Sequence, residues 1–280
     1  MTWTTPALDA LRVGAGFDLD ALDRRSTPGW DSDREAAEKL LVANGERLSE
    51  LQELLYAHGR TNGTRSVLLV LQGMDTAGKG GIVRHVLGMV DPQGVQLKSF
   101  GVPTAEELSH HYLWRIRNAL PTPGRIGVFD RSHYEDVLVV RVDELVPPEV
   151  WEARYEEIVD FEREIVDSGT VLVKVALLVS ADEQKERLRT RLERPDKHWK
   201  YNPSDIDARA KWPDYHEAYR AVLDRTSSDH APWFAVPADR TWFARLAVPE
   251  LLIEALASLE LEWPRADFDV EVELARLEQS

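Results

Sequence analysis

The sequence contains no cysteine in its 280 residues. Disulfide bonds, thiolate nucleophiles and zinc–thiolate sites are therefore excluded. No apolar run reaches membrane-spanning length, and the N-terminus lacks the basic-then-apolar pattern of a signal peptide. An excess of positive charge is also missing: the net charge of -15 argues against a nucleic-acid-binding protein. We expect a soluble cytoplasmic protein with neither nucleic acid nor membrane as a partner.

What the chain does contain is enough apolar sequence, 43% hydrophobic residues, for a sizeable core. Apolar runs predict five strands, and helical patterns separate them, which predicts βαβ units and a parallel sheet. The expected strands are residues 67–71, 95–100, 126–130, 170–179 and 233–236. The fold class is therefore α/β, a three-layer α/β/α sandwich.

The expected domain organisation has three parts. Residues 1–30 show no periodicity and are interpreted as a surface arm. Residues 31–264 form a single domain, in which the pattern of 104–120 favours one helix that starts at the Thr104–Glu107 capping box. Pro249 is expected to kink the helix that starts at Thr241. Residues 265–280 form an acidic, frayed C-terminal tail.

A phosphate loop follows the first predicted strand. Gly73 and Gly78-Lys79 give the pattern G-x-x-x-x-G-K, and the next segment is helical. Glycines let the backbone turn its N–H groups inward, and the helix N-terminus adds positive potential. Strand and helix on either side favour this interpretation over an ordinary tight turn. We expect phosphate contacts from Gly73, Met74, Thr76, Ala77, Gly78 and Gly80, with Lys79 reaching the phosphates.

The loop lacks the usual metal-binding hydroxyl. Gly80 follows Lys79 where a phosphate loop normally carries Ser or Thr. Asp75, inside the loop, is a hard oxygen ligand for Mg2+, with Mn2+ as an alternative. Asp130 ends the third strand; alone it could be a strand-end turn residue, but together with the phosphate loop it favours the second metal-site element. Arg131 follows directly and supplies a cation for phosphate.

Residues 184–211 differ from the rest of the chain in charge. They hold nine basic and five acidic residues, a net charge of +4. A solvated charged helix would explain this. Their place after the fourth strand instead favours a mobile lid that brings cations onto phosphates. The expected phosphate-binding cations are Arg187, Arg191, Arg194, Lys197 and Lys200.

These motifs together resemble the polyphosphate kinase 2 family. The matching segments are residues 73–79 (GMDTAGK), 129–142 (FDRSHYEDVLVVRV), 184–188 (QKERL), 199–200 (WK), Asp205, 212–219 (WPDYHEAY) and 231–233 (APW). The resemblance spans residues 11–264. It is strongest to the class III branch, whose members phosphorylate AMP and ADP.

The resemblance implies a phosphate-loop kinase of the thymidylate-kinase-like fold with a helical lid. Inorganic polyphosphate would be the donor and a purine nucleotide the acceptor, AMP or ADP, with GMP, GDP and the reverse reaction left open. It implies that Asp75 serves the metal and catalysis and that Glu135 helps to admit the nucleotide. Relatives often carry Asn at the position of Asp130. Ser132 and His133, beside Arg131, are the remaining candidates for phosphate or nucleotide contacts.

Two other functions remain open from the residues. The first is an ordinary nucleotide kinase with ATP as donor, and the second is a catalytically silent nucleotide-binding protein. A phosphohistidine at His133 is disfavoured, because direct transfer between in-line oxygens needs no covalent step. The apolar outer helices also suggest a homo-oligomer, dimer or tetramer.

Overall fold

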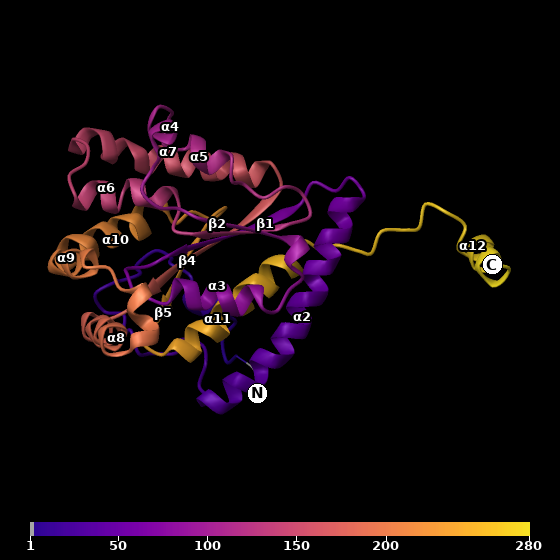
Figure 1. The fold of residues 1–280 in the computed structure, drawn as a ribbon, viewed down its shortest axis with the longest axis horizontal. Helices are drawn as coiled ribbons and strands as arrows, with labels where there is room; N and C mark the ends of the chain where they lie inside the picture. Colours follow the sequence, from indigo (N-terminus) through magenta and orange to yellow (C-terminus); the bar gives the residue numbers. More distant parts are fainter. Residues whose placement is uncertain (1–2) are drawn as a thin grey trace.

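The computed structural model describes residues 3–280 (Figure 1). Its centre is a five-stranded parallel sheet with the order β2-β3-β1-β4-β5. The strands are β1 (Ser66–Gln72), β2 (Val95–Ser99), β3 (Ile126–Asp130), β4 (Thr170–Leu178) and β5 (Trp233–Pro237). The five predicted strands and the parallel sheet are confirmed.

Strand β1 lies in the middle of the sheet, and all seven of its residues are buried. Its side chains alternate between two cores, since successive residues of a strand point to opposite faces. Val67, Leu69 and Leu71 join one core. Leu68 and Val70 join the other. The continuous apolar run in the sequence therefore reflects a strand covered on both sides.

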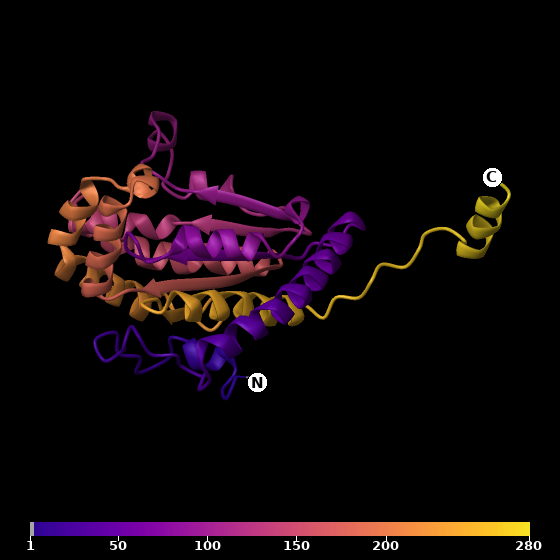
Figure 2. The ribbon, with the colours of Figure 1, turned by 60° about the horizontal axis from the view of Figure 1, so that its bottom comes forward.

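Helices cover both faces of the sheet, as Figure 2 shows. The first core is closed by α1 (Ala7–Leu11), α2 (Arg34–Arg60), α3 (Lys79–Leu87) and α11 (Thr241–Ala257). The second is closed by α5 (Trp114–Arg117), α7 (Pro148–Asp167) and α10 (Trp212–Thr226). The three-layer α/β/α sandwich is confirmed. Helix α11 continues through Pro249.

The segment between β2 and β3 differs from the prediction. Two short helices, α4 (Ala105–Leu108) and α5, replace the single helix expected over residues 104–120. The capping box between Thr104 and Glu107 is present. The Ser109 hydroxyl donates to the Glu106 carbonyl at 2.7 Å and closes the last turn of α4. A side chain that satisfies this carbonyl locally favours an end to the helix over its continuation.

The two chain ends also differ from expectation. Within residues 3–30, Leu11, Leu19 and Trp30 are buried, and the Val13 N–H donates to the Trp233 carbonyl, so this segment is part of the core and not only a surface arm. The C-terminal tail carries a short helix, α12 (Val270–Glu278), where we expected a frayed end. Figures 1 and 2 show the tail projecting away from the domain.

The predicted lid consists of short helical elements at the carboxyl ends of the strands (Figure 1). They are α8 (Ala181–Glu193), the 3-10 helix η3 (Pro195–Lys200) and α9 (Ser204–Ala210), followed by α10. Two further short elements, η2 (His133–Asp136) and α6 (Val139–Val142), follow β3. Among residues 3–280, no helix is long and apolar enough to cross a membrane.

Candidate active site

The phosphate loop connects β1 to α3 through backbone conformations that suit glycine. Gly78 has φ +110°, in the left-handed region, and precedes the first residue of α3. Gly73 is confined for another reason: a Cβ there would lie 2.8 Å from the Leu177 carbonyl of β4. The two glycines of the pattern are thus required by chain geometry, one by its dihedral angle and one by close packing.

Lys79 folds back over the loop. Its Nζ donates to the Gly73 carbonyl at 2.5 Å and lies 3.4 Å from the Met74 carbonyl. Burial lowers the pKa of Lys79, and the charge of Arg131 lowers it further, while Asp75, Asp130 and Glu135 oppose both. The Lys79 ammonium is therefore held by backbone oxygens that an incoming phosphate can replace.

Asp75 and Arg131 form an ion pair across the site. Arg131 Nη2 donates to Asp75 Oδ1 at 3.0 Å. Arg131 has φ +64°, and its backbone N–H donates to the Leu71 carbonyl at 3.0 Å, which joins the ends of β3 and β1. Burial acts to lower the pKa of Arg131, but Glu135, Asp75 and Asp130 hold it above its ordinary value.

Three carboxylates surround the two cations. Asp75, Asp130 and Glu135 all influence the pKa of Lys79 and of Arg131. Burial raises the pKa of Glu135 above its ordinary value, although Arg131 and Lys79 act against it. The Gln72 amide lies 3.0 Å from both Glu135 Oε1 and Ser132 Oγ. Glu135 is thus fixed in place by a polar neighbour from β1.

The carboxylate oxygens at this site fit a hard divalent cation that is bound jointly by the protein and the substrate. Residues 3–280 contain no group of three or more His, Cys, Asp or Glu side chains that could bind a metal alone. Mg2+ usually takes only one or two carboxylates and fills its octahedron with water and substrate phosphates. Asp75 and Asp130, both partly exposed beside the loop, match that mode of binding.

A narrow cavity of about 80 Å³ lies between the phosphate loop and the lid. Gly73, Met74, Asp75, Arg131, Glu135, Leu138, Val139, Gln184, Ala208, Tyr215 and Tyr219 line it. Sequence reasoning did not single out the two tyrosines of α10, although their i, i+4 spacing places them on one helix face. Burial raises the pKa of Tyr215 to about 12, followed by the charges of Asp143 and Glu135.

Ser132 and His133 are among the predicted site residues that do not line this cavity. The His133 side chain is fully buried, and its Nε2 lies 3.2 Å from Glu162 Oε1. The Ser132 hydroxyl, also fully buried, accepts the Tyr134 N–H at 3.2 Å and caps η2. Both side chains are buried here, and their contact with phosphate or nucleotide stays a prediction.

His133 belongs to a buried polar network that the sequence analysis missed. Lys174 Nζ of β4 donates to Glu162 Oε2 at 2.5 Å, to the Tyr134 hydroxyl at 2.9 Å and to the Thr226 carbonyl at 2.8 Å. Tyr134 donates in turn to Glu162 Oε1 at 2.7 Å. The network joins η2 to β4, α7 and α10. It therefore supports the turn that presents Arg131 and Glu135. In the sequence, the sign of this buried network is the single lysine, Lys174, within the otherwise apolar strand β4.

The lid brings one of its five predicted cations to the loop. Arg187 donates from Nη1 to the Thr76 carbonyl at 3.0 Å and from Nη2 to the Ala238 carbonyl at 2.6 Å. This guanidinium therefore clamps the lid to the phosphate loop and to the end of β5.

The other four lid cations contact the lid itself. Arg191 pairs with Asp205 at 3.1 Å, and Arg194 forms a two-point pair with Asp196. Lys197 Nζ lies 3.4 Å from Asp196, and Lys200 Nζ lies over the Trp199 ring. Burial raises the pKa of Asp205, and the negative charge of Asp75 raises it further. The lid therefore also places an acidic side chain near the site.

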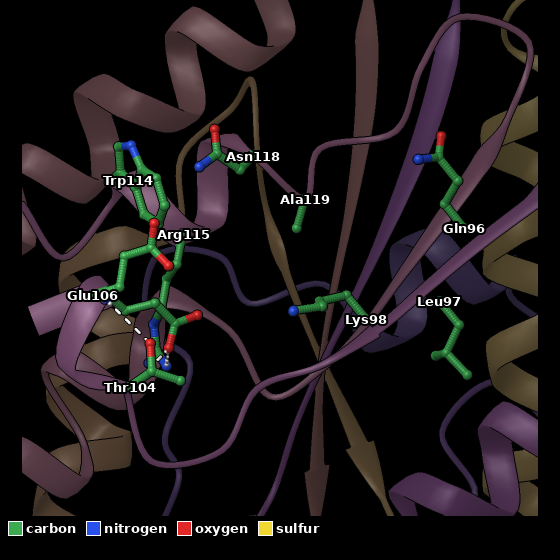
Figure 3. A pocket seen from close by; sticks show the side chains of 10 residues that line it. Gln96, Leu97, Lys98, Thr104, Glu106, Trp114, Arg115, Asn118 and Ala119 are labelled. Carbon is green, nitrogen blue, oxygen red and sulfur yellow. Dashed lines mark hydrogen bonds and ion pairs between the residues drawn. The ribbon is translucent and has the colours of Figure 1, made fainter. Parts of the chain in front are cut away.

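A second, more open cavity of about 500 Å³ lies between the edge strand β2 and the α4–α5 segment. Figure 3 shows Lys98 extending from β2 toward Arg115, with Glu106 and Trp114 beside it. None of the residues that line it belongs to the phosphate loop. It is therefore a separate surface from the site that holds Asp75 and Lys79.

Comparison with known proteins agrees with this geometry. A family model described as "Polyphosphate kinase 2 (PPK2)" matches residues 31–263. The chain belongs to the polyphosphate kinase 2 family. It is 44% identical over 251 residues to the AMP/ADP-polyphosphate phosphotransferase of Meiothermus ruber, covering 90% of this chain and 92% of that protein. The predicted family resemblance is confirmed.

Two further family members extend the match over nearly the whole chain. The ADP-polyphosphate phosphotransferase of Rhodopseudomonas palustris is 42% identical over 282 residues, with 96% of each chain covered. The crystal structure of polyphosphate kinase 2 from Arthrobacter aurescens superposes with a TM-score of 0.98 at 50% identity, covering 100% of this chain and 99% of that one. The fold assigned above is thus the fold of a solved family member.

Proposed function

We propose that this protein transfers a phosphoryl group from inorganic polyphosphate to AMP or ADP. The observation that carries the proposal is the arrangement of Asp75, Lys79 and Arg131 in a loop without the metal-binding hydroxyl. A carboxylate inside the loop would take the place of that hydroxyl, and the chain belongs to a family whose members are named for polyphosphate-dependent transfer. A class III preference for both AMP and ADP remains part of the proposal.

The residues divide the work of phosphoryl transfer between positioning and charge neutralisation. Lys79 would exchange the Gly73 carbonyl for a phosphate oxygen. Arg131 would neutralise the oxygens of the transferring group, where charge stabilisation has its largest effect. Glu135 and the α10 tyrosines line the cavity and would contact the acceptor nucleotide. The backbone of Gly73, Met74, Thr76, Ala77, Gly78 and Gly80 would cradle the donor phosphates.

Asp75 and Asp130 would hold the divalent cation, which we propose to be Mg2+, with Mn2+ as an alternative. When bound, the cation supplies positive charge between donor and acceptor phosphates. Without the cation, Arg131 holds the Asp75 side chain in place by donating from Nη2 to Oδ1 at 3.0 Å. Asp75 can therefore present an oxygen to the cation without a change in the loop backbone.

When the lid closes, its basic side chains would exchange their acidic partners for phosphate groups. Arg191, Arg194 and Lys197 carry acid partners within the lid, so polyphosphate would have to displace Asp205 and Asp196 from them. Arg187 would keep the lid attached to the loop meanwhile. This arrangement supports a lid that is self-neutralised before the polyanion arrives.

A donor–acceptor matrix tests the proposal. The purified protein is incubated with AMP, ADP, GMP or GDP, with polyphosphate or ATP as donor, and with Mg2+ or Mn2+. Nucleotides are then separated by chromatography. We expect ADP and ATP from AMP and ADP with polyphosphate. Transfer with ATP alone would favour an ordinary nucleotide kinase, and no transfer with either donor would favour a silent binding protein. The homo-oligomer and the cytoplasmic location remain predictions.

A further inference from the structure

An open lane leads from the phosphate loop along the solvent face of α3. Gly80 and Gly81 are the first residues after Lys79, and a Cβ at either would meet no other atom within 4 Å. Residues four apart lie on one side of a helix, so Arg84 follows Gly80 and His85 follows Gly81. Arg84 lies about 6 Å farther along the axis, at 1.5 Å per residue. Near the loop, the lane therefore has no side chains, and farther along it has basic ones.

The basic groups at the end of this lane lack acidic partners. Among residues 3–280, neither Arg84 nor Arg245 of α11 forms an ion pair, and Arg245 Nε is buried without a hydrogen-bond partner. Most other arginines of the chain pair with a carboxylate, as expected in a protein of net charge -15. Arg84 and Arg245 are set apart because both lack a carboxylate partner and lie beside the same histidine, His85, next to the lane.

These groups also lie close enough to repel one another. Burial lowers the pKa of His85, and the charges of Arg245 and Arg84 lower it further. Burial likewise lowers the pKa of Arg245, followed by the charge of Arg34 at the start of α2. Arg34 is already paired with Glu38 at 2.7 Å. The remaining cluster, Arg84, His85 and Arg245, gains most from a ligand that brings negative charge.

We propose that Arg84, His85 and Arg245 bind a distal segment of the polyphosphate chain whose reacting end lies in the phosphate loop. This inference rests on the proposed function. A nucleotide that places its phosphates in the loop ends there, whereas polyphosphate continues outward as a flexible polyanion. The glycine lane gives that chain a path without side chains in the way. The cluster then acts as a second binding site for the donor, which only long polyphosphate chains can reach.

The test compares donors of different length in the Arg84→Gln/Arg245→Gln double variant. With long-chain polyphosphate we expect the donor KM to rise about five-fold or more, since two charged contacts are lost. With tripolyphosphate, which ends near the loop, the donor KM should stay within about two-fold, as should kcat and the KM for ADP. The salt dependence of the long-chain KM should also become shallower.

Arg163→Gln provides the matched control. Arg163 of α7 is exposed and forms no ion pair within residues 3–280, but α7 covers the opposite face of the sheet. This variant removes one positive charge without touching the lane, so both donor KM values should stay at the wild-type level. Thermal unfolding of each variant confirms that the fold is intact.

Two outcomes would overturn the inference: an unchanged long-chain KM in the double variant, or an equal rise for both donor lengths. Calorimetric titration with long-chain polyphosphate, without nucleotide, separates this inference from the proposed function. Wild-type binding that weakens in the double variant supports the cluster even if no transfer is detected. Transfer from polyphosphate without any chain-length effect of the variant supports the proposed function and rejects the cluster.

Discussion

Arg131 and Asp75 meet at 3.0 Å, Nη2 to Oδ1, between the end of β3 and the phosphate loop. This contact ties the predicted metal ligand to the predicted phosphate-binding cation. It also explains how a loop without a metal-binding hydroxyl can keep a carboxylate oriented: Arg131 is itself fixed by its N–H bond to the Leu71 carbonyl.

Asp75→Asn tests the metal role of the loop. The amide removes the negative charge but keeps the shape, so we expect kcat to fall by about 10²-fold or more with either Mg2+ or Mn2+. Asp130→Asn is the comparison variant: an Asn oxygen can still be a metal ligand, so this change should keep kcat within about ten-fold. Steady-state rates with ADP and polyphosphate measure both. Equal losses in the two variants would contradict the assignment of Asp75 as the principal ligand.

Glu135 should reduce stability as pH rises. Burial raises its pKa, so the folded protein holds the proton at a pH where the unfolded chain has released it. The unfolding free energy therefore falls as pH rises from the ordinary pKa of glutamate through the raised value. Glu135→Gln removes this loss, and its Tm advantage over the wild type should be larger at pH 7 than at pH 4.5. Thermal scans at both pH values measure it, and a constant difference would contradict the prediction.

The buried Lys174–Glu162 pair should be costly to break on one side only. Lys174→Met removes the lysine cation that pairs with the buried Glu162 carboxylate, so we expect a loss of about 3–5 kcal/mol in unfolding free energy. Arg117→Ala, which breaks the exposed Arg117–Glu164 pair, should cost less than about 1 kcal/mol. Urea denaturation measures both. A mild effect of Lys174→Met would show that the network is not required for the fold.

Arg187 should be the lid cation whose loss affects catalysis most. Arg187→Gln removes the contacts to the Thr76 and Ala238 carbonyls, so we expect kcat/KM for polyphosphate to fall about ten-fold or more. Arg189 is two residues away on α8, exposed and paired with Glu186. Arg189→Gln should stay within about two-fold. The same loss in both variants would indicate a general charge effect and not a lid-to-loop clamp.

The parts of the molecule that follow local rules could be predicted from the sequence. A continuous apolar run gives β1, and the glycines that follow it give the phosphate loop, because both depend on neighbouring residues. Asp75, Lys79 and Arg131 also lie together for this reason: the carboxyl ends of adjacent parallel strands bring the two segments to one edge of the sheet.

The remaining features depend on contacts that sequence neighbours do not reveal. His133 follows Arg131 by two residues, yet it points into the core, where its partner Glu162 is 29 residues away. The charge count of the lid overstated its free cations, since Arg191 finds Asp205 only after the chain turns at η3. Tyr215 reaches the cavity because α10 packs beside the lid, which no local pattern shows.

The most direct test of the account is a single incubation of purified protein with ADP, Mg2+ and long-chain polyphosphate, without ATP. The account predicts ATP formation that Lys79→Ala lowers by about 10²-fold or more, because Lys79 is the cation that the loop holds ready for phosphate. Lys39→Ala, at an exposed ion pair on α2, is the control and should leave the rate unchanged. No ATP formation by the wild type, or full activity of Lys79→Ala, would contradict the account.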